Sequence, residues 1–171
     1  MMPFYRKFSV GILVLAAVLV ALVISGHPIV NTTKSVPVGL WWVVNGPLHR
    51  GDIVLVPIAA FKSTAWVPEG IWSKNAWGKR KPFLKRVAGL PGEHVESREH
   101  SLICIDGMVV PKSSPLSADR LGRKMQAFAL PVVLGDNEIW LTSDSPRGFD
   151  SRYLGPADAS QCRKAIPILT F

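Results

Sequence analysis

The pattern of apolar residues changes once along the chain, near residue 26. Residues 8–24, FSVGILVLAAVLVALVI, form an apolar run without a charged residue. In a helix this run extends about 25 Å, which is enough to cross a thin bilayer. After Gly26 the apolar residues occur in short runs bounded by Gly, Pro, Asn and Asp. Runs of this kind are typical of β-strands joined by turns.

The short apolar runs predict a mainly β fold over residues 27–171. Strands are expected in the segments 39–45, 50–58, 83–97, 101–110 and 137–144. The GPLHRG segment between the first two suits a hairpin connection, and Asp106-Gly107 favours a type I′ hairpin. A short helix is expected after Ile58, ending at Val67-Pro68. No long helical period follows the N-terminal run, so we expect an antiparallel β domain.

Residues 1–26 are expected to form a membrane anchor, one N-terminal transmembrane helix. Arg6 and Lys7 precede the apolar run, and cationic residues tend to stay on the cytoplasmic side. The domain that follows would then lie on the periplasmic side of the inner membrane. Two alternatives stay open. One is a cleaved signal peptide, because VIS-G offers small residues at a cut site, and the other is a buried core helix.

The charge of the chain favours a lipid surface over nucleic acid as a partner. The net charge is +8, and a basic domain near anionic head groups is attracted to them. Apart from KRKPFLKR at 79–86 the cations are scattered, without a zinc spacing or an RNA-binding aromatic signature, so no nucleic acid is expected. Trp66, Trp72 and Trp77 lie among lysines, which suits either a lipid interface or a loop packed on the sheet.

The two cysteines, Cys104 and Cys162, allow two interpretations. An oxidising compartment permits a disulfide between them, and the alternative is a pair of buried free thiols. Two cysteines without supporting histidines do not make a metal site. We expect no metal and no cofactor.

Candidate catalytic groups are narrowed by their sequence context. A Ser-His-Asp triad is not favoured, because every histidine borders the apolar run or lies in a turn or charged loop; these are His27, His49, His94 and His100. No two acidic residues share an apolar strand face, so a carboxylate pair is not favoured either. The remaining option is a serine with a lysine as general base. An amine accepts a proton only when neutral, and burial favours the neutral form.

Lys85 meets the requirement for a neutral lysine. Strand alternation in PFLKRVAGL places Lys85 on one face with Phe83 and Val87, in apolar surroundings. The alternative interpretation is a lysine that protects an edge strand against aggregation. Ser35 in TTKSVPVGLWW is the candidate nucleophile, although the segment also suits an ordinary linker after a membrane helix.

Four blocks of sequence resemble the type I signal peptidase family. KSVPVGLWW, RGDIVLV, LKRVAGLPGE and FDSRYLGP occur in the order of that family, and the resemblance covers about Thr33 to the C-terminus. Family members use a Ser-Lys dyad on membrane-proximal substrates. The Ser-x-Pro-x-Gly spacing, the following aromatic residue and the ending FDSRYLGP…AIPILTF are most similar to the conjugative branch of the family, the TraF-type peptidases.

The resemblance implies roles for five residues. Ser35 would be the nucleophile and Lys85 the general base, and the Ser35 backbone N–H would supply one oxyanion donor. Thr33 would supply a second donor through its hydroxyl. Asp150 and Arg152 would form a salt bridge that braces the loop beside Lys85.

One position departs from the family pattern. Many relatives carry a serine two residues before the aspartate of the FDSRYLGP block, where it hydrogen-bonds the lysine. Here that position is Gly148. The candidates to replace that serine are Ser143, Ser145 and a water molecule.

The resemblance implies a membrane-anchored serine signal peptidase with a signal-peptidase-like antiparallel β domain. The implied substrate is a membrane-embedded precursor, the pilin-like subunit of a conjugative type IV secretion system, matured to a linear or a cyclic product. Two alternatives remain. One is a general type I leader peptidase, and the other is a non-enzymatic, membrane-tethered assembly factor for conjugation.

Overall fold

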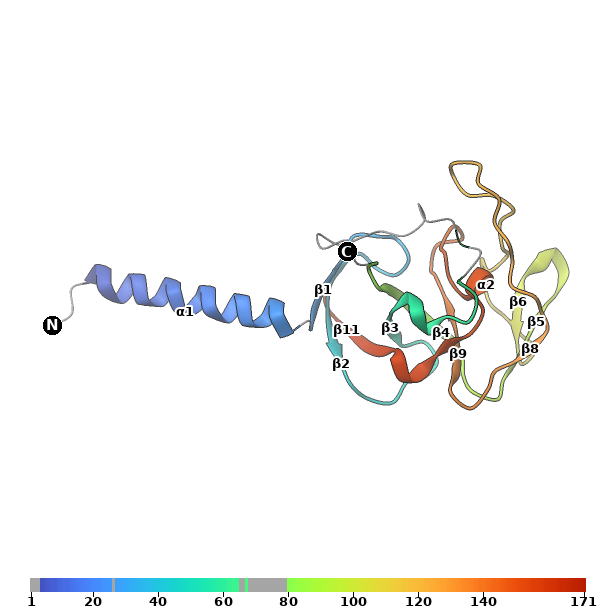
Figure 1. The fold of residues 1–171 in the computed structure, drawn as a ribbon, viewed down its shortest axis with the longest axis horizontal. Coiled ribbons are helices and arrows are strands. Elements are labelled where there is room, and N and C mark those ends of the chain that lie inside the picture. Colours follow the sequence, from blue (N-terminus) through green and yellow to red (C-terminus); the bar gives the residue numbers. More distant parts are fainter. Residues whose placement is uncertain (1–3, 26, 65–66, 68–79) are drawn as a thin grey trace.

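A computed structural model shows one long helix that extends from a β domain (Figure 1). The structure describes residues 4–25, 27–64, 67 and 80–171. The predictions made for Trp66, Trp72 and Trp77 fall outside the described residues.

Helix α1, Phe4–Ser25, lies within the predicted anchor segment. Its large apolar side chains that the structure describes are exposed: Val10, Ile12, Leu13, Val14, Leu15, Val18 and Val20. This exposure rules out the alternative of a buried core helix. Among the described residues, no helix is long and apolar enough to cross a membrane. The transmembrane helix therefore stays a prediction.

The domain consists of two antiparallel sheets, which confirms the predicted mainly β fold. The larger sheet has the strand order β1-β2-β11-β3-β4-β9-β10. Its strands are β1 Pro28–Asn31, β2 Gly39–Val44, β11 Arg163–Thr170, β3 Ile53–Val56, β4 Phe83–Gly89, β9 Glu138–Thr142 and β10 Ala157–Asp158.

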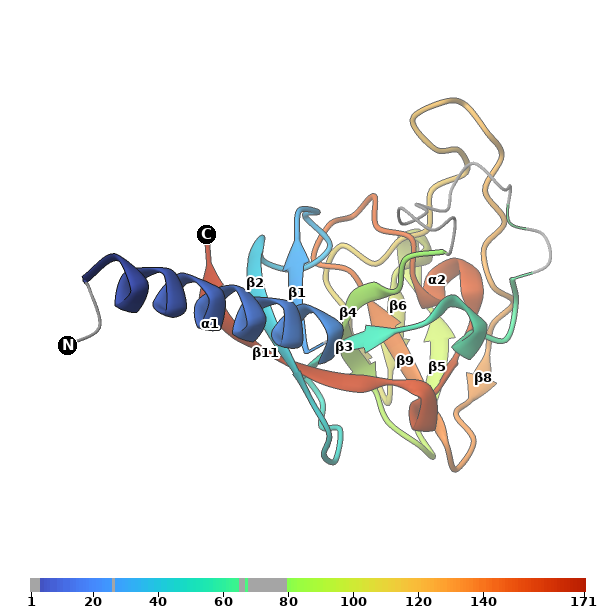
Figure 2. The same cartoon turned by 60° about the vertical axis from the view of Figure 1, so that its left-hand side comes forward.

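The smaller sheet has the strand order β7-β6-β5-β8. Its strands are β7 Met108–Val109, β6 Ile103–Ile105, β5 His94–Ser97 and β8 Val132–Val133. Besides α1, the helices in the described residues are single turns: η1 Ile58–Ala60, η3 Glu99–Ser101, α2 Ser151–Leu154 and η4 Ala159–Gln161. Strands β5 and β8 lie at the end of the domain away from α1 (Figure 2).

The hairpin expected between β2 and β3 is wrong. Strand β11, from the end of the chain, lies between them and pairs its Ala165 with Val43 on one side and Ile53 on the other. The GPLHRG segment still connects β2 to β3. Its local composition cannot indicate that β11 is inserted between these two strands. The three strands share a cluster of buried apolar side chains that are distant in sequence, Trp41, Ile53 and Ala165.

The hairpin at Asp106-Gly107 is confirmed. Cys104 pairs with Val109 and Ile105 with Met108 across it. The φ angles are 45° at Asp106 and 81° at Gly107, and a type I′ turn requires positive values at both central residues.

The helix expected after Ile58 is shorter than predicted. It is the single turn η1, and the chain then extends so that Phe61 forms a β-bridge with Ala157. The same part of the core includes Val54, Val56 and Leu154.

Cys104 and Cys162 are buried free thiols, so the disulfide alternative is wrong. Cys104 lies in the smaller sheet, and Cys162 follows η4 beside the core of the larger sheet. Burial raises the pKa of the Cys162 thiol to about 12. A thiol with such a pKa stays protonated at neutral pH and is unreactive.

Candidate active site

Ser35 lies in the turn between β1 and β2, and a buried asparagine organises this turn. The side-chain Nδ2 of Asn31 donates to the carbonyl oxygens of Thr33 at 2.8 Å, Val36 at 3.0 Å and Pro37 at 3.0 Å. Its Oδ1 accepts from the backbone N–H of Thr33 at 3.1 Å. One side chain therefore fixes the backbone on both sides of Ser35. Sequence reasoning missed Asn31, although an Asn before a hydroxyl-rich turn is a known turn signal.

The turn is also anchored by apolar packing and by a glycine. Val36 is 1% exposed and packs in a cluster with Trp41 and Leu84. At Gly39 the φ angle is 149°, and a Cβ there would lie 2.0 Å from the carbonyl oxygen of Leu169. Glycine therefore lets β11 approach β2 directly after the turn.

The Ser35 side chain is half-buried and faces β4. Its Oγ lies 2.9 Å from Thr33 Oγ1 and donates to the Leu84 carbonyl oxygen at 3.3 Å. The Ser35 carbonyl oxygen accepts from the Asp144 N–H at 2.8 Å and from Ser143 Oγ at 3.3 Å. The turn is thus held against β4 and against the segment that follows β9.

Lys85 is 3% exposed, on the strand that receives the Ser35 hydrogen bond. It pairs with Val54 of β3, and its Nζ lies 5.1 Å from the ring centroid of Phe83. Burial lowers its pKa from 10.5 to about 8, Arg152 adds to the lowering, and Asp150 and Asp144 oppose it. With a pKa of about 8, roughly a tenth of the amine is neutral at pH 7.

The structure brings Ser35 and Lys85 to neighbouring positions. Ser35 Oγ is bonded to the carbonyl of Leu84, the residue before Lys85. Within the described part of the chain, Ser35 Oγ donates to the Leu84 carbonyl oxygen and lies close to Thr33 Oγ1, and no hydrogen bond joins it to Lys85 Nζ. Hydrogen bonds between a nucleophile and its general base are often long without substrate and tighten when the substrate binds.

Asp150 and Arg152 form the predicted salt bridge, with both side chains almost fully buried. Arg152 Nε donates to Asp150 Oδ1 and Nη2 to Oδ2, each at 2.8 Å. Asp150 Oδ2 also accepts from the Ser143 N–H at 2.9 Å, at the end of β9. The Arg152 guanidinium donates further to the carbonyl oxygens of Lys112, Ser114, Ser145, Pro146 and Gly148. The pair therefore fixes the segment after β9.

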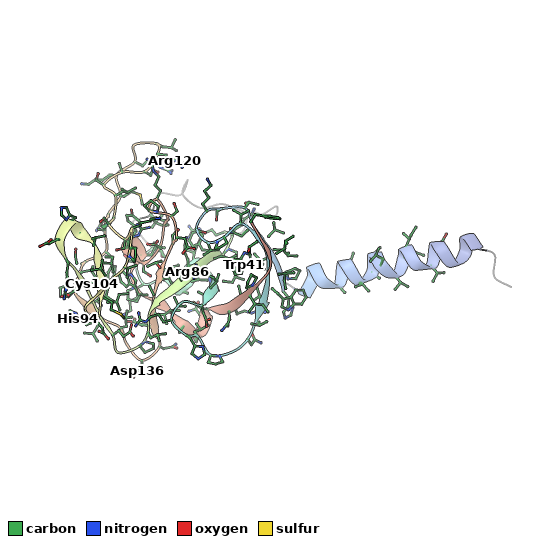
Figure 3. The ribbon with its side chains drawn as sticks, turned by 180° about the vertical axis from the view of Figure 1, so that it is seen from behind. Trp41, Arg86, His94, Cys104, Arg120 and Asp136 are labelled. Carbon is green, nitrogen blue, oxygen red and sulfur yellow. The ribbon has the colours of Figure 1, made fainter. Side chains whose placement is uncertain are left out.

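A second ion pair, which sequence reasoning missed, reaches the Ser35 turn. Arg86 Nε and Nη2 donate to the two carboxylate oxygens of Asp144 at 2.9 and 2.8 Å. The backbone N–H of the same Asp144 donates to Ser35. Figure 3 shows Arg86 in the middle of the domain, with Trp41 nearer to α1 and His94 at the opposite end.

Two of the histidines considered as catalytic bases, His27 and His49, have other contacts. The His27 ring stacks on Trp42 with the centroids 5.5 Å apart, and His49 Nδ1 lies 3.6 Å from Asp52 Oδ2. Among the residues that the structure describes, no three His, Cys, Asp or Glu side chains are grouped so as to hold a metal ion.

A comparison with known families defines the class of the protein as a peptidase. The family model described as "Signal peptidase, peptidase S26" matches residues 4–166. The chain therefore belongs to the signal peptidase family.

Relatives of nearly equal length show which branch of the family the chain resembles. The "Conjugal transfer protein TraF" of Agrobacterium fabrum (strain C58 / ATCC 33970) is 37% identical over 171 residues, covering 97% of this chain and 95% of the relative. The "Plasmid transfer protein TraF" of Escherichia coli is 29% identical over 178 residues, covering 97% of each. These relatives confirm the resemblance to the TraF-type branch of the family.

One solved structure that resembles the chain is also a signal peptidase. The signal peptidase I from Enterococcus faecalis V583 is 20% identical with a TM-score of 0.43, and covers 72% of this chain and 99% of that chain.

Proposed function

We propose that the protein is a membrane-anchored serine endopeptidase in which Ser35 is the nucleophile and Lys85 the general base. The observation that carries the proposal is that Lys85 is buried and directly follows Leu84, whose carbonyl oxygen accepts the hydrogen bond from Ser35 Oγ. Burial keeps part of the amine neutral near pH 7, and a neutral amine can accept the serine proton.

The chemistry follows from these two groups. As Ser35 Oγ attacks the scissile carbonyl carbon, Lys85 Nζ takes the hydroxyl proton and becomes an ammonium. When the tetrahedral intermediate collapses, the C–N bond breaks and the ammonium gives its proton to the leaving amine, which leaves an ester on Ser35. A water molecule or a second amine then attacks the ester, Lys85 takes the proton from it, and Ser35 recovers its hydroxyl proton.

The oxyanion of the intermediate would be stabilised by the Ser35 N–H and the Thr33 hydroxyl. Thr33 Oγ1 donates to Asn31 Oδ1 at 2.9 Å in the absence of substrate. A hydroxyl has one proton, so Thr33 must rotate its O–H away from Asn31 to donate to the oxyanion. Asn31 Oδ1 keeps the Thr33 N–H as a partner after that rotation.

The proposed substrate is an exported precursor, specifically the pilin-like subunit of a conjugative type IV secretion system. The names of the relatives, which are conjugal and plasmid transfer proteins, support this assignment. The exposed apolar side chains of α1 support attachment to the inner membrane, with the β domain on the periplasmic side. Such a tether would hold Ser35 near the bilayer, where membrane-embedded precursors end.

The test of the substrate class compares two precursors. The full-length protein in detergent is incubated with a conjugative pilin precursor and, separately, with an unrelated secretory precursor, and the intact masses of the products are recorded. We expect cleavage of the pilin precursor only. A pilin product about 18 Da lighter than the linear form would indicate an amine acceptor within the substrate, since cyclisation loses one water. Cleavage of both precursors would favour a general leader peptidase. Cleavage of neither precursor would favour an assembly factor.

A further inference from the structure

Lys85 lies in β4, and Ser143 is the first residue after the neighbouring strand β9. Arg86 of β4 pairs with Thr142, the last residue of β9, in an antiparallel register, and continuing this register by one residue places Ser143 opposite Lys85. Residues directly opposite each other in such a pair point to the same face, with Cβ atoms about 4.5–5.5 Å apart. Both side chains are buried, with 3% of Lys85 and 8% of Ser143 exposed.

The Ser143 side chain fills the space beside Gly148. A Cβ added at Gly148 would lie 2.0 Å from Ser143 Cβ and 2.1 Å from Ser143 Oγ. Arg152 holds the Gly148 carbonyl oxygen at 2.7 Å, so this part of the backbone is fixed. Only one of positions 143 and 148 can therefore carry a side chain here, and in this chain it is position 143.

The hydrogen bonds of the Ser143 hydroxyl leave one acceptor position open. Its Oγ donates to the Ser35 carbonyl oxygen at 3.3 Å and accepts from the Ser145 N–H at 3.2 Å. A hydroxyl has one proton and two lone pairs, so one lone pair has no assigned donor among the described residues. The Ser145 hydroxyl is engaged elsewhere, because it accepts from the Arg147 N–H at 3.3 Å.

We propose that Ser143 is the positioning residue of the candidate dyad: its Oγ accepts a hydrogen bond from Lys85 Nζ while its O–H donates a hydrogen bond to the Ser35 carbonyl oxygen. This inference rests on the proposed function. A neutral amine has two protons and one lone pair, so fixing one N–H on Ser143 limits the directions open to the lone pair. Ser143 also holds the Ser35 backbone, so one hydroxyl sets the relative position of nucleophile and base.

The geometry at Gly148 provides a matched set of variants. Ser143→Ala and Ser143→Gly remove the hydroxyl. The double variant Ser143→Gly with Gly148→Ser returns a hydroxyl to the same space from the other segment, without the 2.0 Å contact. Gly148→Ser alone retains that contact and is expected to unfold at a lower temperature.

The first readout needs no substrate. Full-length protein in detergent carries lysine labelled with ¹³C at Cε, the Lys85 signal is assigned by its loss in Lys85→Ala, and the signal is titrated. A hydroxyl acceptor stabilises the ammonium, so we expect Ser143→Ala to lower the pKa of Lys85 and the double variant to return it towards the wild-type value. The other charged groups that act on Lys85 are Asp150, Arg152 and Asp144, which every variant keeps. An unchanged pKa in Ser143→Ala would overturn the inference.

The second readout is cleavage of the pilin precursor. Misplacement of a catalytic group costs about 10²-fold in rate. We expect a loss of this order in kcat for Ser143→Ala with little change in KM, and recovery in the double variant. A double variant that melts like the wild type but is no more active than Ser143→Gly would contradict the inference. A wild-type protein that cleaves nothing, yet shows the titration shift, would refute the proposed function alone.

Discussion

The hydroxyl of Thr33 donates a hydrogen bond of 2.9 Å to the side-chain Oδ1 of Asn31. Thr33 Oγ1 also lies 2.9 Å from Ser35 Oγ. A chain of three side chains therefore runs from a buried amide to the candidate nucleophile. It holds the Thr33 hydroxyl in the place from which it would reach an oxyanion formed at Ser35.

Thr33→Ala is expected to lower kcat about 10²–10³-fold, because one oxyanion donor is lost. KM should change little, since the donor acts on charge that develops only in the transition state. Thr33→Ser keeps the hydroxyl and is the matched control. Equal rates for the alanine and serine variants would show that the hydroxyl does not act in catalysis.

Asn31→Ala is expected to destabilise the protein by about 1–3 kcal/mol. The substitution leaves the carbonyl oxygens that Asn31 serves without their partner, and one of these bonds, to Val36, is buried. Thermal or denaturant unfolding measures the loss. Asn137→Ala is the control, because Asn137 is exposed and its amide bonds a surface carboxylate, Asp158. A loss no larger than that of the control would contradict the role given to Asn31.

The rate of cleavage is expected to depend on pH through Lys85. Only the neutral amine accepts the serine proton, and its pKa is about 8. The ratio kcat/KM, which reports the free enzyme, should therefore rise about tenfold per pH unit below 8 and level off above it. A profile measured from pH 6 to 10 checks this expectation. An inflection between pH 6 and 7 would point to a histidine instead.

Lys85→Met is expected to stabilise the folded protein at pH 7. Lys85 has a lowered pKa in the folded state, so the unfolded chain binds its proton more tightly. Burying the charged amine therefore destabilises the folded protein. This destabilisation is fully present below pH 8 and is lost as the pH rises from about 8 to 10.5. A lowering of this size corresponds to about 3 kcal/mol.

The free energy of unfolding of Lys85→Met and of the wild type, measured between pH 7 and 10.5, tests this expectation. The difference should shrink as the pH rises. Lys164→Met is the control, because Lys164 forms an ion pair with Asp52 at 2.9 Å and its removal should not stabilise the protein. A Lys85→Met variant that is less stable than the wild type at pH 7 would contradict the burial argument.

Local features of the fold were predictable from the sequence, and non-local ones were not. The turn at Asp106-Gly107 and the burial of Lys85 on β4 follow from residue preferences and strand alternation. The insertion of β11 between β2 and β3 depends on packing between segments more than a hundred residues apart. Whether Cys104 and Cys162 meet depended on the same long-range arrangement.

The candidate site divides in the same way. Ser35, Lys85, Asp150 and Arg152 carry sequence signals because they lie in the blocks that resemble the signal peptidase family. Asn31 acts through the backbone carbonyl oxygens of a turn, and the direction of those oxygens is set by the folded chain. The choice among Ser143, Ser145 and water likewise required the strand register and the contact at Gly148.

The central claim is that Ser35 and Lys85 together cleave a precursor. The most direct test is the intact mass of a conjugative pilin precursor co-expressed with the wild-type protein, Ser35→Ala, Lys85→Ala or the control Lys164→Ala. We expect the precursor to lose the mass of its leader only with the wild type and the control, while all four proteins accumulate in membranes. A processed precursor in cells with Ser35→Ala or Lys85→Ala would contradict the dyad.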